Sequence, residues 1–319
     1  MRRAVLCCLL LACRRDDKAQ RQPTPNVPSQ PSAAPAAPVA SGAAPACSLS
    51  PLPAKRPAAK RVVAIGDLHG DLAATRSAFK AAGLIDDKDT WTGKDTVVVQ
   101  LGDVLDRGDD EQAILDLIFK LEGEAKAAGG ELVMLLGNHE LMNAAGDFRY
   151  VTPGAMKDFD DAGAGPREKV LGPGGVYAKK LAAHDVIAIV GDTVYSHAGI
   201  VGDFVTQVSA VNMSARCWLD GQAGGPREAP IAMQSEESPV WTRAFGVDPV
   251  DCAAAKAAIE KLGVKRMVVA HTPQLQGVNA VCDGLVWRVD VGLAKHYGGP
   301  IEVLELVDGA APKVLKGTR

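Results

Sequence analysis

The stretch VVAIGDLHGD, residues 62–71, ends a run of small apolar residues in an aspartate, a histidine and a second aspartate. Residues 62–65 are typical of a buried β-strand, because β-branched side chains fit a pleated sheet. Gly66 ends this strand, and Asp67 and His69 follow on a tight turn, where both side chains can point the same way. The stretch alone also fits a strand, a turn and a helix in which an aspartate serves only as the helix cap.

The same pattern returns after four further apolar strands, and this favours a function for the polar residues. A single strand-end aspartate is usually a cap, and a single histidine is more often a satisfied core residue than a ligand. Five strand ends that all carry such side chains indicate a metal site. The further ones are Asp103 and Asp106 in VVVQLGDVLDRGD (97–109), Asn138, His139 and Glu140 in LVMLLGNHE (132–140), His197 in TVYSHAGI (193–200) and His271 in RMVVAHTPQ (266–274).

From residue 61 the chain alternates predicted strands and helices, which is typical of an α/β domain. In α/β sheets, functional sites gather at the carboxyl ends of strands. The helices are predicted at 72–82, 110–128, 176–183 and 252–262. The strands are predicted at 62–65, 96–101, 132–136, 186–190, 193–196, 267–270, 285–289 and 301–306.

Residues 143–175 interrupt this alternation, because they are polar and rich in glycine. The segment is predicted to be a long loop or a small lid-like insertion, and long loops in compact domains are often functional. His184 is expected to be a surface residue or a strand cap. The chain of 319 residues has a net charge of −3, so it lacks the basic excess typical of nucleic-acid-binding proteins.

The first 60 residues do not have the pattern of a folded domain. Residues 1–13, MRRAVLCCLLLAC, carry two arginines, a short apolar run and Cys13. The run is too short to span a bilayer, and it resembles a bacterial lipoprotein signal in which the cysteine is lipidated. An ordinary secretory signal and a misassigned start codon are the alternatives. Residues 14–60 are rich in Pro and Ala and are predicted to be a disordered linker. We therefore expect an exported protein, periplasmic or membrane-anchored through Cys13.

Export would permit disulfide bonds among the cysteines that follow Cys13. Their spacing matches no zinc-binding pattern, and the connectivity cannot be read from the sequence. These cysteines are Cys47, Cys217, Cys252 and Cys282. Free buried cysteines are the alternative to disulfides.

The mixture of Asp, His and Asn at the strand ends predicts two divalent transition-metal ions, Mn, Fe or Zn. Imidazole suits these metals, and carboxylate and amide oxygens suit Mn and similar hard ions. Two ions ~3.5–4 Å apart can clamp the attacking and leaving oxygens of a displacement at phosphorus, with a metal-bound hydroxide as nucleophile. Arg107 lies next to Asp106, and its planar guanidinium can hold two phosphate oxygens.

The motifs GDLHG, GDVLDRG, GNHE, HAGI and AHT resemble those of the calcineurin-like metallophosphoesterases, and of their phosphoprotein phosphatase branch in particular. GNHELMN, GDFRYV and SPVWTR are similar to the Shewanella-like protein phosphatases of bacteria and plants. The resemblance covers residues 61–307. It implies an α/β fold with a central β-sandwich flanked by helices, in a metallophosphoesterase domain over residues 61–319.

The resemblance also implies roles for individual residues. The first metal would be held by Asp67, His69 and Asp103. The second metal would be held by the bridging Asp103 together with Asn138, His197 and His271. His139, oriented by Asp106, would protonate the leaving oxygen. Phosphate would be bound by Arg107, Asn138 and Arg243. Apart from the resemblance, Arg149 in the insertion is a further candidate for phosphate binding, because functional sites favour loops. A surface ion pair is the alternative role for Arg243.

The implied activity is that of a metal-dependent phosphomonoesterase acting by in-line attack on a phosphorylated protein. The similarity to Shewanella-like phosphatases favours phosphotyrosine. Related enzymes with similar motifs cut dinucleoside polyphosphates, so a hydrolase of these or of other small phosphate esters is the alternative. A non-catalytic binding protein of the same fold is a third interpretation, which the complete set of motif residues disfavours.

Overall fold

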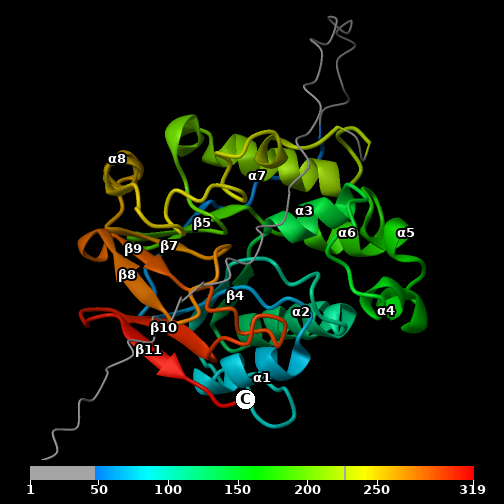
Figure 1. The fold of residues 1–319 in the computed structure, drawn as a ribbon, viewed down its shortest axis with the longest axis horizontal. Coiled ribbons are helices and arrows are strands. Elements are labelled where there is room, and N and C mark those ends of the chain that lie inside the picture. Colours follow the sequence, from blue (N-terminus) through cyan, green and yellow to red (C-terminus); the bar gives the residue numbers. More distant parts are fainter. Residues whose placement is uncertain (1–46, 226–227) are drawn as a thin grey trace, which may run out of the picture. The chain divides into compact units, whose positions relative to one another are not determined.

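A computed structural model of the chain describes residues 47–225 and 228–319. The predicted signal segment 1–13 and the predicted linker up to residue 46 lie outside the described residues. Within the described part, two β-sheets form the centre and helices cover their outer faces (Figure 1). No helix in this part is long and apolar enough to cross a membrane.

The five-stranded sheet has the order β11-β10-β2-β3-β4, and the six-stranded sheet has the order β1-β5-β6-β7-β9-β8. In the first sheet β2, β3 and β4 are parallel, and in the second β6, β7 and β9 are parallel. Because these strands are parallel, the loops that follow their carboxyl ends all leave a given sheet at the same edge. The strands are β1 Lys55–Arg56, β2 Arg61–Ile65, β3 Val97–Gln100, β4 Glu131–Met134, β5 Ile187–Val190, β6 Thr193–Ser196, β7 Arg266–Val269, β8 Asn279–Val281, β9 Val286–Arg288, β10 Glu302–Val307 and β11 Lys313–Lys316.

Helices α1 and α2 pack on the five-stranded sheet, and α7 and α8 pack on the six-stranded sheet (Figure 1). Asp71 caps α1, because its Oδ1 accepts a hydrogen bond from the backbone N–H of Ala74. The α-helices are α1 Leu72–Ala81, α2 Glu111–Ala127, α3 Asn138–Ala144, α4 Ala155–Asp161, α5 Arg167–Leu171, α6 Val176–Leu181, α7 Val208–Leu219 and α8 Cys252–Leu262. Short 3₁₀ turns lie at Gly202–Thr206, Ile231–Met233 and Cys282–Gly284.

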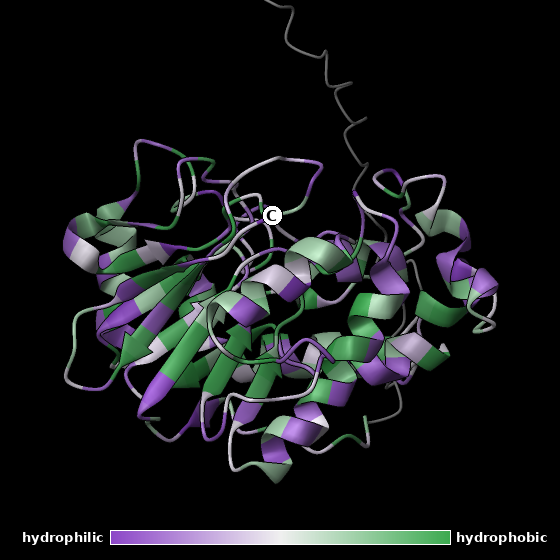
Figure 2. Ribbon diagram, turned by 90° about the horizontal axis from the view of Figure 1, so that it is seen from below, coloured by the Kyte–Doolittle hydropathy of each residue, from purple (hydrophilic) through white to green (hydrophobic). Residues whose placement is uncertain are grey.

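Both faces of the central strands are buried, which explains their nearly continuous apolar sequences. In β2, Val62 and Ala64 belong to the core between the two sheets, whereas Val63 and Ile65 belong to the core beneath the helices. Figure 2 shows the strands as hydrophobic along most of their length and the outer helices as mixed in hydropathy. The predicted sandwich flanked by helices is confirmed.

All eight predicted strands and all four predicted helices are present, with their ends shifted by two residues at most. The segment 143–175 is more ordered than the predicted loop, because it contains α4 and α5. His184 is buried, contrary to the surface position expected for it. Its Nε2 lies 2.7 Å from Glu122 Oε1, and this contact raises the pKa of His184 although burial alone would lower it.

The described folded region begins before residue 61, where the domain was predicted to start. Residues 47–60 fall within the predicted linker, yet β1 pairs in parallel with β5, and Cys47 is disulfide-bonded to Cys217 on α7. A second disulfide joins Cys252 and Cys282. The structure thus supplies the connectivity that spacing alone left open.

These disulfides should stabilise the fold unequally, because cross-linking a longer loop restricts the unfolded chain more. The Cys47–Cys217 bond spans 170 residues and the Cys252–Cys282 bond spans 30. The chain-entropy model assigns them about 5 and about 4 kcal/mol. Replacing the first pair by alanine should lower the melting temperature by roughly 10 °C, and more than replacing the second pair. Free thiols at these positions in the oxidised protein, detected by alkylation and mass spectrometry, would contradict the pairing.

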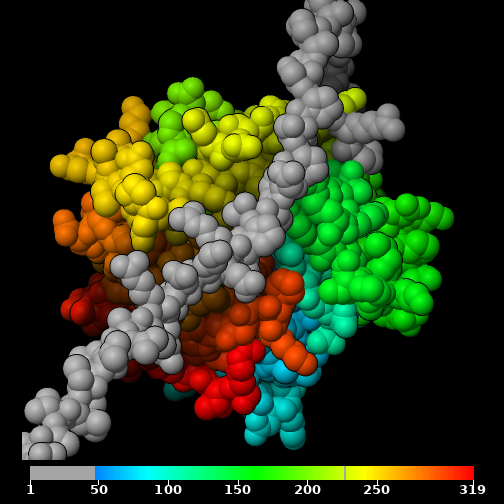
Figure 3. Space-filling model, in the orientation of Figure 1, coloured from blue at the N-terminus to red at the C-terminus, as the bar shows by residue number. Residues whose placement is uncertain are grey.

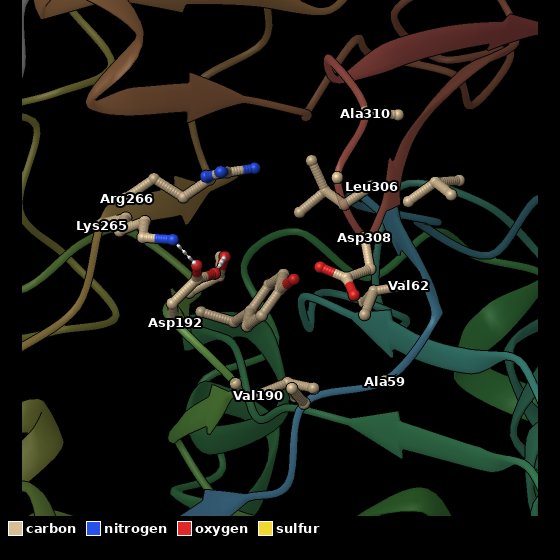
Figure 4. Close-up of a pocket in the computed structure, with 15 residues that line it drawn as sticks. Ala59, Val62, Val190, Asp192, Lys265, Arg266, Leu306, Asp308 and Ala310 are labelled. Carbon is tan, nitrogen blue, oxygen red and sulfur yellow. Dashed lines mark hydrogen bonds and ion pairs between the residues drawn. The ribbon is translucent and has the colours of Figure 1, made fainter.

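The edge of the sandwich where β7 begins and β10 ends holds a small cavity of about 240 Å³ (Figure 4). Lys265 and Arg266 lie on one side of it and Asp308 lies on the other. The Tyr195 hydroxyl is buried there without a hydrogen-bond partner in the described part of the chain. The carboxyl ends of the parallel strands lie at the opposite edge, and the candidate site is found there.

Candidate metal centre

The polar residues that follow five separate strands come together in one buried cluster. Asp67 and His69 follow β2, Asp103 follows β3, Asn138 and His139 begin α3 after β4, and His197 and His271 follow β6 and β7. Each of these seven side chains is at least nine-tenths buried. The structure therefore brings all the predicted metal ligands to one place, together with the predicted acid.

The backbone around the cluster is held in conformations that non-glycine residues seldom adopt. Five non-glycine residues there have positive φ: His69, Asp103, Asp106, Arg107 and His271. Two glycines let the loops after β3 and β4 meet, because a Cβ on Gly102 would lie 2.4 Å from the backbone nitrogen of Gly137. Such local strain gathers at functional sites.

Asp103 occupies the middle of the cluster. Its Oδ2 lies 3.8 Å from His69 Nε2, 3.8 Å from His139 Nε2 and 3.2 Å from His197 Nε2. Two groups of ligand atoms are close enough to hold an ion, and both contain Asp103: one with His69 and His139, the other with His197 and His271. One carboxylate therefore joins two adjoining candidate sites.

Other ligand atoms lie around the same two sites. Asn138 Oδ1 is 2.9 Å from His197 Nε2, and His271 Nδ1 is 3.2 Å from the same nitrogen. Asp67 Oδ2 is 3.8 Å from His69 Nε2. The rings of His69 and His197 are fixed from behind, because their Nδ1 atoms contact the backbone carbonyls of Leu105 and Leu101. Partners of this kind hold an imidazole in orientation for a metal.

The charges of the cluster suit a bound cation. Burial raises the pKa of Asp67 well above its ordinary value, and the neighbouring carboxylates Asp290 and Asp103 raise it further. Burial lowers the pKa of His69 to about 4 and that of His271 to well below the ordinary value, whereas Asp103 raises the pKa of His197 against the effect of burial. Neutral imidazoles are the form that binds metal, and a divalent cation would offset the cost of the buried carboxylates.

Two buried polar atoms in the cluster have no hydrogen-bond partner in the described part of the chain, His271 Nε2 and Asp290 Oδ2. Burying a polar atom without a hydrogen-bond partner costs free energy, so each such atom needs an explanation. The donor set of imidazoles, carboxylates and one amide is of the type that Mn, Fe and Zn accept. On both counts the residues fit a pair of divalent transition-metal ions.

His139 is held by a carboxylate on the side away from Asp103. Its Nδ1 is 2.5 Å from Asp106 Oδ2, so its Nε2 is left to face the centre of the cluster. Burial alone would lower the pKa of His139, but Asp103 and Asp106 raise it above its ordinary value. Arg167 of α5, fully buried, approaches the other oxygen of Asp106 to 3.4 Å and contacts Glu111. The insertion thereby braces the His139–Asp106 pair.

Arg107 is held in place by Tyr150, a second residue of the insertion. The Arg107 guanidinium lies 4.0 Å from the centre of the Tyr150 ring, and the Arg107 backbone N–H donates to the Tyr150 carbonyl at 3.1 Å. Arg107 Nε is buried without a partner among the described residues. A guanidinium stacked on a ring keeps its N–H groups free for a ligand.

The two other predicted phosphate-binding arginines lie further out. Arg243 is exposed and donates to the Thr272 hydroxyl at 3.2 Å, next to His271. Arg149 is also exposed, and its guanidinium forms an ion pair with Asp147 at 2.7 Å. Arg243 thus lies at the rim of the centre, whereas Arg149 is engaged within its own loop.

Sequence reasoning did not single out several residues of the site. Asp290 follows β9, so the strand-end pattern that located the other ligands could have located it as well. The aromatic and buried charged residues carry no such signal, because their role depends on which loops fold together. Three half-buried rings each face one histidine, at 5.2, 6.0 and 5.3 Å between centroids: Tyr150 on His139, Trp241 on His271 and Tyr297 on His69.

A family model described as calcineurin-like phosphoesterase matches residues 60–275, which contain every predicted metal ligand. The chain belongs to the calcineurin-like phosphoesterase family. It is a metal-dependent phosphatase, as the motifs predict, and the family implies divalent metal ions at the cluster around Asp103.

Relatives in this family carry the names of protein phosphatases. The chain is 40% identical over 294 residues to Shewanella-like protein phosphatase 2 of Arabidopsis thaliana, covering 77% of this chain and 75% of that protein. It is 27% identical over 257 residues to Shewanella-like protein phosphatase 1 of Plasmodium berghei, covering 75% and 69%. The predicted resemblance to Shewanella-like phosphatases is confirmed.

A solved phosphatase structure has the same fold. The cold-active protein-tyrosine phosphatase of a psychrophilic Shewanella species superposes with a TM-score of 0.71, at 24% identity and 83% coverage of both chains. The calcineurin-like fold predicted from the motifs is therefore confirmed.

Proposed function

We propose that this phosphatase is an exported two-metal enzyme that removes phosphate from phosphorylated proteins, with phosphotyrosine as the preferred residue. The observation that carries the two-metal chemistry is the position of Asp103, which contributes to two adjoining groups of ligand atoms. The names of the relatives in the family support protein substrates.

Asp67, His69 and Asp103 would hold one ion, and Asp103 with Asn138, His197 and His271 would hold the other. Two such ions would polarise the phosphoryl oxygens and lower the pKa of the attacking water. Glu140 keeps the shared ligand in place, because its carboxylate accepts hydrogen bonds from the backbone N–H groups of Asp103, Val104 and Gly137, each at 2.8 Å. Manganese, iron and zinc all suit this donor set.

The protein's own residues would bind and orient the phosphoryl group. Arg107 offers its free N–H groups from its position over Tyr150. Arg243 would bind a phosphoryl oxygen from the rim of the centre. Asn138 would contact both a metal and a phosphate oxygen. Charge that builds on the phosphoryl oxygens in the transition state would thus meet donors that are already positioned.

His139 would deliver the proton that the leaving oxygen needs. Its Nδ1–H donates to Asp106, which leaves the proton on Nε2 for transfer towards the centre. Asp106 has the same role as an orienting carboxylate in other acid–base pairs: it fixes the ring and stabilises the protonated form.

The aromatic surroundings of the centre favour an aryl phosphoester. Tyr150, Trp241 and Tyr297 come from three separate loops and border a polar, charged centre. Aromatic rings bury large areas and pack edge-to-face or offset against other rings. The ring of a phosphotyrosine would pack against these aromatic side chains, whereas a phosphoserine would leave most of their surface exposed to water.

An exported enzyme is consistent with the disulfides at Cys47–Cys217 and Cys252–Cys282, because such bonds persist in oxidising compartments. The signal-like residues 1–13 and a lipidated Cys13 would attach the enzyme to a membrane. Labelling with a radioactive fatty acid tests this part of the proposal, and Cys13→Ala should abolish the incorporation.

Metal removal and restoration tests the proposed activity. The purified protein is stripped with a chelator, assayed on p-nitrophenyl phosphate, and then given Mn, Fe or Zn in turn. We expect activity to disappear and to return with two ions per chain. Phosphotyrosine peptides should then be hydrolysed faster than phosphoserine peptides or dinucleoside polyphosphates. Faster hydrolysis of dinucleotides would favour the small-molecule alternative, and no bound metal would contradict the site.

A further inference from the structure

A cleft of about 630 Å³ opens beside the metal centre, and its inner end is formed by His69 and Arg107. Figure 3 shows orange atoms of the C-terminal part of the chain beside blue and teal atoms of its first half. The cleft is large enough for side chains that flank a phosphorylated residue. Its walls come from four parts of the chain: 69–71, 107–110, 152–154 and 295–296.

Two exposed carboxylates, Asp109 and Asp110, line the cleft on the wall that continues from Arg107. Asp109 accepts a hydrogen bond from the Thr152 hydroxyl, and Asp110 accepts a long one of 3.4 Å from the backbone N–H of Leu72. Within residues 47–225 and 228–319, neither carboxylate has a lysine, arginine or histidine at ion-pair distance. Both carboxylates therefore line the cleft without an ion-pair partner among the described residues.

Two further carboxylates lie near this wall. Asp158 on α4 has a raised pKa, first because it is partly buried and then because Asp110 and Asp109 repel its charge. Asp71 lines the cleft as well, but its two oxygens already accept hydrogen bonds from the backbone N–H groups of Ala74 and Lys295.

The rest of the cleft lining supplies little positive charge. Lys295 is exposed there, and His296 has a pKa below its ordinary value because of burial and the nearby Arg107, so it is neutral at pH 7. The cleft is lined by three carboxylates, Asp71, Asp109 and Asp110. Once Arg107 binds the phosphoryl group, Lys295 is the one cation left to balance them among the described residues that line the cleft. The cleft is thus complementary to a positively charged group next to the phosphate.

We propose that this cleft binds the residues that flank the phosphorylated side chain of a protein substrate, and that Asp109 and Asp110 select lysine or arginine there. The inference rests on the proposed function, because it requires a protein substrate. Exposed charge pairs act over short distances and are weakened by salt. The selectivity should accordingly be modest and dependent on ionic strength.

The test uses the full-length, metal-loaded enzyme and two sets of phosphotyrosine peptides, flanked by arginine or by glutamate on each side. Each kcat/KM is divided by the value for p-nitrophenyl phosphate, which has no group to reach the cleft. We expect the arginine set to exceed the glutamate set by about tenfold at low salt, and by much less in high salt. Asp109→Asn with Asp110→Asn should reduce this ratio at least about threefold, because asparagine keeps the acceptor oxygen but not the charge.

A matched variant separates local recognition from net charge. Asp160→Asn with Asp161→Asn, on the exposed face of α4 outside the cleft, makes the same change in net charge and should leave the ratio as it was. An unchanged ratio in the Asp109 and Asp110 variant, an equal fall in the matched variant, or a preference for glutamate would overturn the inference alone. Hydrolysis of p-nitrophenyl phosphate without hydrolysis of any peptide would overturn the proposed function, and the inference with it.

Discussion

Asp103→Asn should cost the enzyme at least about 1000-fold in kcat/KM and reduce its bound metal to less than two ions per chain. Asp103 is the carboxylate common to both groups of ligand atoms, at 3.8 Å from His69 Nε2 and 3.2 Å from His197 Nε2. Asparagine has nearly the same shape, but it offers one neutral oxygen where two charged oxygens are needed. Both sites should therefore weaken together.

Metal content by mass spectrometry and rates on p-nitrophenyl phosphate measure this effect. Asp185→Asn is the matched control, because Asp185 is also buried beside a strand but lies near Arg216 and Arg56 and lines a different cavity from the one beside the metal centre. The control should retain two metals and nearly full activity. If Asp103→Asn kept two metals and full activity in a folded protein, the dinuclear assignment would be wrong.

The strand ends were predictable because a buried strand requires apolar residues, whereas metal binding requires polar side chains, and the two kinds of residue follow one another in the sequence. A run such as residues 62–65 must be apolar on both faces to lie between a sheet and a helix layer. The polar side chain that follows it has no role in that core, so its repetition after five strands indicates a shared site. Asp290 follows the same rule after β9, and a consistent application of the rule would have included it.

The parts that depend on tertiary packing could not be predicted in the same way. Arg167 and Tyr150 lie in a segment with only weak hydrophobic periodicity, and the folded chain brings them to Asp106 and Arg107. Sequence alone favoured the neighbouring Arg149 because it is an arginine. In the structure Arg149 pairs with Asp147, and the ring beside it contacts the centre.

Three of the four strands at the sheet margins, β1, β8 and β11, were missed for a related reason, whereas the marginal strand β4 was predicted. β1 is two residues long and β8 is three, and both contain exposed positions, so neither has an apolar run that stands out. Edge strands are stabilised by their neighbours more than by their own side chains. β1 in particular is anchored by pairing with β5 and by the nearby Cys47 disulfide, neither of which shows in a local pattern.

His139→Asn should lower kcat by about 100- to 10,000-fold while leaving two metal ions bound, since general acid catalysis contributes on that scale. The Nδ1 atom of His139 is committed to Asp106 at 2.5 Å, and only Nε2 faces the centre. Asparagine cannot carry a titratable proton to the leaving oxygen. The loss should be largest for alkyl phosphates, whose leaving oxygen depends most on protonation, and smaller for p-nitrophenyl phosphate.

The same measurement decides between two roles that the geometry allows for His139. Its Nε2 lies 3.8 Å from Asp103 Oδ2, so His139 also belongs to a group of atoms that could hold an ion with His69. An acid would leave the metal content intact and make the rate depend steeply on the leaving group. A ligand would take one ion with it and slow all substrates alike. His184→Asn is the matched control, because His184 is equally buried but paired with Glu122 outside the centre, and it should change neither quantity.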